Sequence, residues 1–185
     1  MNNGNAAGSG TSLDSTIAYD QAMMKPAPIK HVHYPALIRL NAAVVEKTAP
    51  MDADDLASFV NGAVYARQVN DGEAMLLVLD QAADFYDSEH FAFFAARHKS
   101  FYYIDRIIVA PSLHGTGVGR ALYEDLFGWV AAAGGGIIGC EVNTTPPNPV
   151  SHAFHRTLGF KPCGTGSREL PDGGTKQVTY YEITV

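Results

Sequence analysis

The sequence has few cysteines, a modest number of basic residues and no long apolar run, and each of these absences excludes a class of protein. Its two cysteines, Cys140 and Cys163, are too few for a disulfide framework and do not form a CxxC pair. We therefore expect reduced thiols in a cytoplasmic protein. The net charge of −6 and the absence of any run of five like charges exclude the clustered basic surface of a general nucleic-acid-binding domain.

Membrane association and metal binding also lack support in the sequence. The longest uncharged apolar stretch, 126–140, is rich in glycine and shorter than the roughly 20 residues that a membrane span needs. We expect no signal peptide, because no charged region followed by an apolar stretch begins the sequence. His152 and His155 are three residues apart, but no third ligand has suitable spacing, so we expect no metal site.

The composition favours one globular domain with a disordered arm before it. Hydrophobic residues make up 46% and charged residues 17% of the 185 residues, which is typical of a domain that can bury a sizeable core. Residues 1–28 are rich in Asn, Gly, Ser and Ala and show no periodicity, so we expect disorder there. The single domain is then expected to span residues 29–185.

Hydrophobic periodicity and turn residues predict a mixed α/β fold. An Asn70-Asp71-Gly72 turn between two β-rich runs indicates a hairpin. Aromatic residues are frequent in 82–100, where we expect a loop and a short helix that belong to the core or to a pocket wall. We predict helices over 36–47, 51–63, 117–134 and 147–160, and strands over 29–33, 63–69, 73–81, 101–111, 137–143, 160–166 and 175–185.

Three glycines mark the start of one predicted helix. Residues 113–122 read LHGTGVGRAL, with Gly115, Gly117 and Gly119 at every second position. Glycine lowers helix stability by roughly 0.5–1 kcal/mol relative to alanine, so these residues need another purpose. The first N–H groups of a helix have no partner within it, and the macrodipole places partial positive charge there. Because glycines let that backbone approach a phosphate closely, the stretch predicts an anion site.

Two well-known phosphate-binding loops do not fit this stretch. A P-loop needs GxxxxGK[ST], which is absent. A Rossmann fingerprint needs GxGxxG/A, but the sixth position is Arg120 when counted from Gly115 and Leu122 when counted from Gly117. What remains is the pattern [Gln/Arg]xxGxG/A after a strand that ends in V-x-P, here at Val109.

That pattern resembles the GNAT superfamily of acetyl-CoA-dependent N-acyltransferases. Gly117 and Gly119 match the two glycines of the family, Gly115 matches a frequent extra one, and His114 stands where the family usually has Arg or Gln. A second family motif, NxxAxx[L/F]YxxxGF, resembles residues 148–160. The family's Asn, Phe and GF pair are present at Asn148, Phe154, Gly159 and Phe160, while Ser151 replaces Ala and His155 replaces Tyr.

The resemblance covers about 29–185 and implies a fold, a reaction and partners. It implies the GNAT acyl-CoA N-acyltransferase fold, an α/β single domain whose central sheet is mostly antiparallel, with a parallel central pair and flanking helices. It implies an acyltransferase that moves the acetyl group of acetyl-CoA, used as co-substrate, to a primary amine by direct attack. Homodimers are common in the family, and the β-rich C-terminal stretch over 178–185 would offer a free edge for one.

By resemblance, three segments would build the acetyl-CoA site. The main-chain groups of Ile108, Val109 and Ala110 would bind the pantetheine arm and face the thioester carbonyl. The second motif would add Asn148, Ser151 and His155. The pyrophosphate would be bound by the loop residues His114, Gly115, Thr116, Gly117, Val118, Gly119 and Arg120.

His155 is the first candidate catalytic residue. In the family, the Tyr of the second motif protonates the leaving thiolate. An imidazole, whose ordinary pKa is about 6.5, can do the same work from His155. The structural alternative is that His155 is a packed or surface residue of its helix.

Two carboxylates are candidates for the base that deprotonates the amine. Strand alternation places Glu141 on one face with Asn143, and Asp105 on one face with Ile107. Either carboxylate would act through a water molecule. The structural alternatives are an ion pair between Asp105 and Arg106, and a solvated or hydrogen-bonded role for Glu141.

Two other functions stay open at this point. The replacement of the family's Tyr by His155 leaves room for a catalytically weak acyl-CoA-binding module or sensor. The second alternative is an acyltransferase that prefers a longer acyl-CoA to acetyl-CoA. No motif in the sequence identifies the acceptor amine.

Overall fold

The computed structural model describes residues 25–46, 48–169 and 173–185. Within these ranges, no helix combines the length and the apolar character needed to cross a membrane. The helical segments are η1 (His31–His33), α2 (Tyr34–Ala42), α3 (Ala53–Gly62), η2 (Asn70–Gly72), α4 (Glu89–Ala95), η3 (Pro111–Leu113), α5 (Val118–Ala132) and α6 (Pro149–Thr157). The strands are β1 (Ala27–Pro28), β2 (Tyr65–Val69), β3 (Ala74–Asp80), β4 (Tyr102–Val109), β5 (Ile137–Thr145), β6 (Lys161–Glu169) and β7 (Thr175–Thr184).

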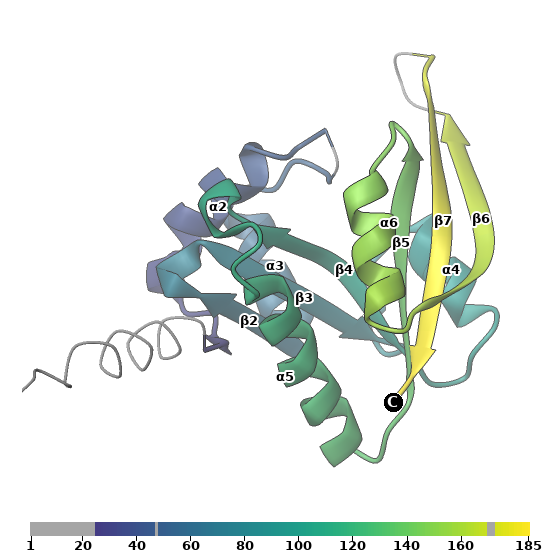
Figure 1. Cartoon of the computed structure of the whole chain (residues 1–185), viewed down its shortest axis with the longest axis horizontal. Coiled ribbons are helices and arrows are strands. Elements are labelled where there is room, and N and C mark those ends of the chain that lie inside the picture. The colour runs from purple at the N-terminus through teal and green to yellow at the C-terminus, as the bar shows by residue number, and fades with distance from the viewer. Residues whose placement is uncertain (1–24, 47, 170–172) are drawn as a thin grey trace, which may run out of the picture.

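The strands form one seven-stranded sheet in the order β1-β2-β3-β4-β5-β7-β6 (Figure 1). Every neighbouring pair is antiparallel except β4 and β5, which run parallel at the centre. A parallel pair needs a crossover connection, and α5 supplies it between these two strands. The predicted α/β fold, with a mostly antiparallel sheet, a parallel central pair and flanking helices, is therefore confirmed.

Helices cover both faces of the sheet. α5 and α6 lie on one face, and α3 and α4 lie on the other (Figure 1). In β3, Leu76 and Val78 pack toward α5, whereas Met75 and Leu77 pack toward α2 and α3, so this central strand is apolar on both sides. In α5, Val118, Leu122, Leu126 and Val130 form a fully buried apolar stripe.

The segment before α2 differs from the prediction. We expect a strand over 29–33, but β1 lies before that range and η1 occupies its end. The Lys30 N–H donates to Nδ1 of His33 over 3.0 Å, and Pro35 lies in the first turn of α2 directly afterwards. These local bonds and the proline turn the chain out of the extended conformation, which overrides the alternation of the side chains.

Both ends of the domain differ from what the sequence suggests. The chain joins the sheet at Ala27, before the expected domain start at residue 29, and residues 1–24 of the expected arm lie outside the described residues. The expectation that the C-terminal strand offers a free edge is wrong. β7 lies between β5 and β6 and pairs with both, so β6 is the edge strand on that side.

The central strands β4 and β5 pair only over their first residues. The two pairs are Tyr102 with Ile138 and Tyr103 with Gly139, and beyond them the strands diverge (Figure 1). A β-bulge in β4 falls at Asp105, which has no partner in the register with β3. The divergence opens the middle of the sheet, and the candidate site lies there.

Candidate active site

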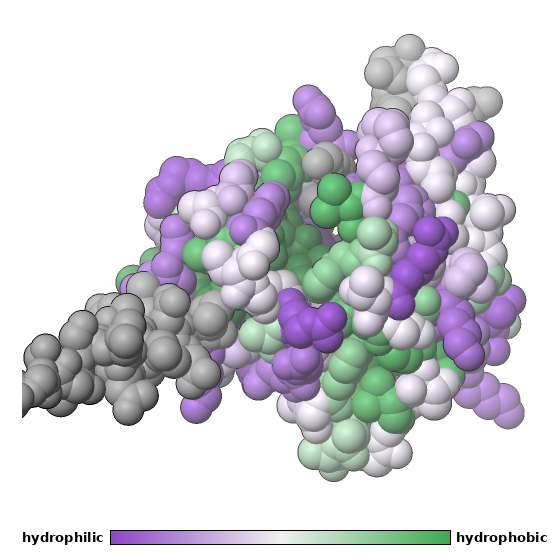
Figure 2. All heavy atoms as spheres, in the orientation of Figure 1, coloured by the Kyte–Doolittle hydropathy of each residue, from purple (hydrophilic) through white to green (hydrophobic). Residues whose placement is uncertain are grey.

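A cleft of about 1180 Å³ lies where β4 and β5 diverge. On one face of the sheet its walls are the glycine loop and the first turns of α6, and on the other they are the start of α4 and parts of β6 and β7. Figure 2 shows the surface hollowed between the two halves of the molecule, with hydrophobic residues at the wall. Because residues from both faces of the sheet line the cleft, one molecule can enter from each face and the two can meet between β4 and β5.

The main-chain groups of β4 point alternately to β3 and to the cleft. The Ala110 N–H donates to the Glu73 carbonyl over 2.8 Å, so it is used within the sheet. By the alternation of an antiparallel ladder, Ile108 also turns its main chain to β3, whereas Ile107 and Val109 turn theirs to the cleft. Of the three residues expected to bind pantetheine, only Val109 presents its main chain there, and Ile107 joins it.

The three glycines of the loop serve two different purposes. Gly115 and Gly117 have φ values of +78° and +95°, a region that other residues rarely adopt, and Gly117 is the N-cap of α5. Gly119 is helical, but a Cβ there would lie 3.3 Å from Cζ of Phe154 on α6. The first two glycines therefore turn the backbone, and the third lets α6 pack closely against α5.

A row of free N–H groups lies at the start of α5. Two loop members are already used, because the His114 N–H donates to the Pro111 carbonyl and the Thr116 N–H donates to the Leu113 carbonyl. These two residues of the expected pyrophosphate site contribute no free N–H. No acceptor from the described part of the chain contacts the remaining groups, which belong to Gly115, Gly117, Val118, Gly119 and Arg120.

The side chains of the loop complete its geometry. Nε2 of His114 lies 3.0 Å from the Val109 carbonyl, which can only accept, so His114 donates there. The exposed Arg120 guanidinium lies 3.7 Å from the Glu124 carboxylate, one turn along α5. Because an exposed ion pair of this kind is weak, a bound anion of higher charge can replace Glu124 as the partner of Arg120. The Thr116 hydroxyl donates to the Leu113 carbonyl and closes the turn.

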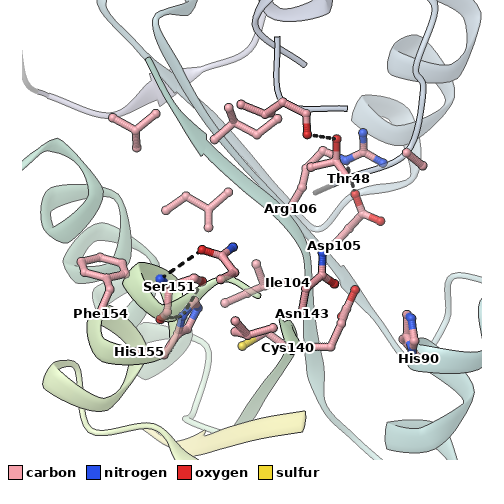
Figure 3. Close-up of a pocket in the computed structure, with 18 of the residues that line it drawn as sticks. Thr48, His90, Ile104, Asp105, Arg106, Cys140, Asn143, Ser151, Phe154 and His155 are labelled. Atoms are coloured by element: carbon pink, nitrogen blue, oxygen red, sulfur yellow. Dashed lines mark hydrogen bonds and ion pairs between the residues drawn. The ribbon is translucent and has the colours of Figure 1, made fainter. Parts of the chain in front are cut away.

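The matched residues of the second motif hold α6 in place. The Asn148 side chain accepts a hydrogen bond from the Ser151 N–H over 3.4 Å and caps the helix. Gly159 has a φ of +94° just after the helix ends, and Phe160 is buried in the core. Ser151 and His155 lie on the side of α6 that borders the cleft (Figure 3).

His155 is buried, and both of its ring nitrogens are bonded. Nδ1 lies 2.8 Å from the Ser151 carbonyl, which can only accept, so Nδ1 carries the proton. Nε2 then accepts a hydrogen bond from the Tyr123 hydroxyl over 2.7 Å. Burial lowers the pKa of His155, and the ring is neutral at pH 7. These contacts favour the packed structural role over the acid role that the family's Tyr implies.

Glu141 lies on the β5 wall of the cleft. Its Oε2 accepts a hydrogen bond from the Tyr103 hydroxyl over 2.7 Å. Burial is the main reason that the pKa of Glu141 is raised to about 7, and the Asp105 carboxylate acts in the same direction while the Tyr103 hydrogen bond opposes it. A carboxyl group that titrates near neutral pH suits a general base.

Asp105 is fully engaged with its neighbours. One oxygen accepts from the Tyr86 hydroxyl over 2.6 Å, the other accepts from Nε of Arg106 over 2.5 Å, and the side chain is 3% exposed. The expectation that Asp105 shares a face with Ile107 is wrong, because the bulge turns Asp105 toward Tyr86 while Ile107 packs on the α5 side. The ion-pair alternative therefore fits Asp105, and Glu141 is the stronger base candidate.

The opposite wall of the cleft contains residues that the sequence analysis does not single out. Tyr86 and His90 come from the aromatic stretch 82–100, where a pocket wall is one of the two expected roles. Arg168 and Lys176 come from β6 and β7. Alternation along a strand indicates which residues share a face, but a single sequence does not show which strands pair. Sequence reasoning therefore could not place Arg168 and Lys176 at the cleft. Across the described ranges, no three His, Cys, Asp or Glu side chains are grouped to hold a metal ion.

Comparison with known proteins agrees with this geometry. The chain matches the Acetyltransferase (GNAT) family over residues 63–160. A curated N-acetyltransferase from Streptomyces griseus is 41% identical over 77 residues, which make up 41% of this chain and 39% of that protein. The match thus spans about two fifths of the length of that relative.

The solved structures that share the fold include two acetyltransferases. One is the acetyltransferase of GNAT family from Streptococcus pneumoniae, with a TM-score of 0.62, 14% identity and coverage of 86% of this chain and 98% of that one. The other is a GNAT superfamily phosphinothricin acetyltransferase from Sinorhizobium meliloti in complex with AcCoA, with a TM-score of 0.63, 17% identity and coverage of 87% and 88%.

The family match extends from just before β2 to the residue before β6. It therefore includes the diverging strands, the glycine loop and the second motif, which form most of the cleft. The resemblance stated from the two motifs is confirmed. The chain belongs to the acetyltransferase (GNAT) family.

Proposed function

We propose that the protein transfers the acetyl group of acetyl-CoA to a primary amine by direct attack in the cleft between β4 and β5. The observation that carries this function is the placement of Glu141, whose pKa is raised to about 7, in the same cleft as the free N–H groups at the start of α5. Family membership supports acyl transfer, and the relative from Sinorhizobium meliloti was solved in complex with AcCoA.

The pyrophosphate of acetyl-CoA binds at the glycine loop. The free N–H groups from Gly115 to Arg120 point out of a helix N-terminus, where backbone donors and the macrodipole favour an anion. The positive φ values of Gly115 and Gly117 leave open space at the position of a Cβ, so phosphate oxygens can approach the backbone. The Arg120 guanidinium adds a charge at the same end of α5.

The pantetheine arm follows β4 into the sheet. The main-chain groups of Ile107 and Val109 face the cleft, so an amide of pantetheine can add to the open edge of β4 as a short strand would. His114 donates to the Val109 carbonyl, which retains a second lone pair for the arm. The Ile107 N–H lies just after the bulge and is the donor for the thioester oxygen as negative charge develops on it.

Glu141 prepares the attacking amine. A primary amine is mostly protonated at neutral pH and must lose a proton before it can attack a thioester. Glu141 has a pKa of about 7 and therefore exists partly as a carboxylate under the same conditions, so it can accept that proton directly or through one water. The Tyr103 hydroxyl holds one oxygen and leaves the other for this task.

The hydroxyl of Ser151 is the polar group that α6 offers to the leaving thiolate. Its Oγ lies 3.3 Å from Nδ1 of His155, and the residue lines the cleft at the first turn of α6 (Figure 3). His155 and Tyr123 stand behind it and hold the helix in position. A hydrogen bond from Ser151 would stabilise the thiolate while solvent supplies the proton.

Calorimetric titration with acetyl-CoA, with CoA and with NADH as a control tests the binding half of this function. We expect micromolar binding of the first two and none of NADH. A panel of primary amines, read by thiol release, then tests transfer. Failure of acetyl-CoA to bind would overturn the function, and binding without transfer to any amine would identify the catalytically weak acyl-CoA-binding module instead. Thioesters of longer chains would show whether acetyl is the preferred group.

A further inference from the structure

Two cations lie side by side on the wall of the cleft that faces away from the glycine loop. Arg168 of β6 and Lys176 of β7 are direct partners in the antiparallel register, so their side chains share one face of the hairpin. Both line the cleft, where Lys176 is half-buried and Arg168 is exposed. Figure 3 shows His90 of α4 on the same side of the diverging strands as Asp105 and Arg106.

Lys176 is on the same face of the sheet as the proposed base. Glu141 pairs with Tyr180 across β5 and β7, and Lys176 is four residues from Tyr180 along β7, so alternation places all three on one face. The charges also act on each other, because the pKa of Glu141 is lowered by Lys176 while that of Lys176 is raised by Glu141, in each case against a larger effect of burial. The cation thus faces the reacting part of the cleft.

Neither cation forms an ion pair within the described residues. No carboxylate in those ranges lies within 4.0 Å of Lys176 or Arg168. The nearby Asp105 carboxylate is bonded to Arg106, and one oxygen of Glu141 is bonded to Tyr103. Burial is the main reason that the pKa of Lys176 is lowered; the Glu141 and Asp105 carboxylates raise it without forming an ion pair, and the positive charges of Arg168 and Arg106 lower it.

The other polar groups of this wall do not neutralise the positive charges of Lys176 and Arg168. Burial, then Lys176 and Arg168, lower the pKa of His90 to about 4, so His90 is neutral, and its Nδ1 contacts the Tyr180 hydroxyl at 3.1 Å. The acidic residues of the rim are Asp55, Asp87 and Glu89, which are exposed, and Asp55 accepts from the Asp52 N–H.

We propose that the acceptor is a primary amine that also carries a carboxylate, with its nitrogen at Glu141 and its carboxylate at Lys176 and Arg168. The proposal rests on the proposed acetyltransferase function and names the acceptor class of that site. Tyr180, which lies opposite Glu141, is four residues or about 13 Å from Lys176 along β7. The long lysine side chain can cover part of that distance toward Glu141. The spacing therefore favours acceptors in which several bonds separate the nitrogen from the carboxylate.

Matched pairs of acceptors test this assignment. Glycine, 4-aminobutyrate and 6-aminohexanoate are each compared with their own amide, so that only the negative charge differs within a pair. We expect kcat/KM for the best carboxylate to exceed that of its amide by about 10- to 100-fold, as charge-assisted hydrogen bonds to two cations would give. Lys176→Met should remove most of this ratio by raising KM for the carboxylate, whereas any change through the pKa of Glu141 acts on both members of a pair and cancels in the ratio.

Lys161→Met is the control variant, because Lys161 is an exposed lysine of the same hairpin and does not line the cleft. It should leave the ratio unchanged. Calorimetry of the CoA-loaded protein with the N-acetylated form of each pair provides a readout without turnover, and the carboxylate should bind more tightly than the amide. If acetyl-CoA itself does not bind, the proposed function fails. If acetyl-CoA binds and no carboxylate is preferred in either measurement, this acceptor assignment is overturned while the proposed function stands.

Discussion

The Tyr123 hydroxyl of α5 donates a hydrogen bond of 2.7 Å to Nε2 of His155 on α6, and both residues are buried. The bond joins the helix that follows the glycine loop to the helix that carries the second motif. The rings of Phe154, Phe160 and Tyr181 lie around His155. The residue at the position of the family's Tyr is thus a central contact between the two helices that border the cleft.

Tyr123→Phe should destabilise the protein without weakening acetyl-CoA binding. The change leaves Nε2 of His155 as a buried acceptor without a donor, which costs about 1–3 kcal/mol of unfolding free energy. Urea denaturation measures the loss, and calorimetry measures the affinity. Tyr102→Phe is the matched control, because its hydroxyl has no hydrogen-bond partner in the described chain and its ring still packs on Trp129. Equal stability of the two variants would show that the bond is not formed.

His155→Phe separates the structural role from the acid role. From its two hydrogen bonds, we expect the variant to lose stability, while kcat of the folded enzyme at low temperature falls by less than tenfold. A general acid contributes about 10²- to 10⁴-fold to the rate, so a loss of that size in kcat with normal stability would assign the acid role to His155 after all. Steady-state kinetics and urea denaturation of the same preparation give both numbers.

Glu141→Gln should abolish the pH dependence of acetyl transfer and most of the activity. With a pKa of about 7 for Glu141, the active carboxylate form increases through neutral pH, so kcat/KM of the wild type should rise between pH 6 and pH 8. The exposed Glu46 supplies the control, and Glu46→Gln should keep the wild-type profile. An unchanged profile in Glu141→Gln would contradict the assignment of the base.

The same variant should be more stable than the wild type at high pH. The unfolded chain ionises its Glu residues near their usual pKa of about 4.3, whereas folded Glu141 holds its proton up to about pH 7. The folded state therefore binds more protons between these values, and the unfolding free energy of the wild type falls as pH rises through that window. Glutamine does not titrate, so the gap in melting temperature between variant and wild type should grow from pH 5 to pH 8.

Substitutions of Gly117 should affect acetyl-CoA binding, whereas Gly128 in the same helix should not. Gly117→Ala places a side chain at a φ of +95° and costs about 1–2 kcal/mol, and Gly117→Asp adds a carboxylate against the proposed phosphate site. We expect a clear loss of affinity for Ala and loss of detectable binding for Asp. Gly128→Ala fills open space in the middle of α5 and should stabilise the protein by about 0.5–1 kcal/mol with unchanged affinity. Normal affinity of Gly117→Asp would refute the loop assignment.

Asp105→Asn should act mainly on stability. It removes the charge that faces the buried Arg106 guanidinium, which also donates to Oδ1 of Asn41 over 2.7 Å and to Sδ of Met51 over 3.6 Å. Loss of one member of a buried ion pair costs about 3–5 kcal/mol. Thermal unfolding checks the loss, and activity at a temperature where the variant is folded should stay within tenfold of the wild type. Normal stability with a large loss of kcat would restore Asp105 as a base candidate.

Local patterns predicted the elements of this fold well. The turn at Asn70 and the glycines at a helix start each depend on residues close in sequence, and the structure places them as expected. The two motifs also indicated the family correctly, because they are local strings of residues. The strand predicted over 29–33 failed because the His33 side chain accepts a local hydrogen bond and Pro35 lies in the first turn of α2, and alternation of side chains represents neither effect.

The sequence alone therefore determined most of the order of helices and strands, the glycines that turn the chain at the start of α5 and the family, since all three follow from neighbours along the chain. Only the tertiary structure decided which groups face the cleft. The bulge at Asp105 reversed one predicted face, the register with β3 turned Ala110 away from the cleft, and packing between α5 and α6 buried His155. These outcomes depend on contacts between residues far apart in the chain, and such contacts leave no periodic signal in a single sequence.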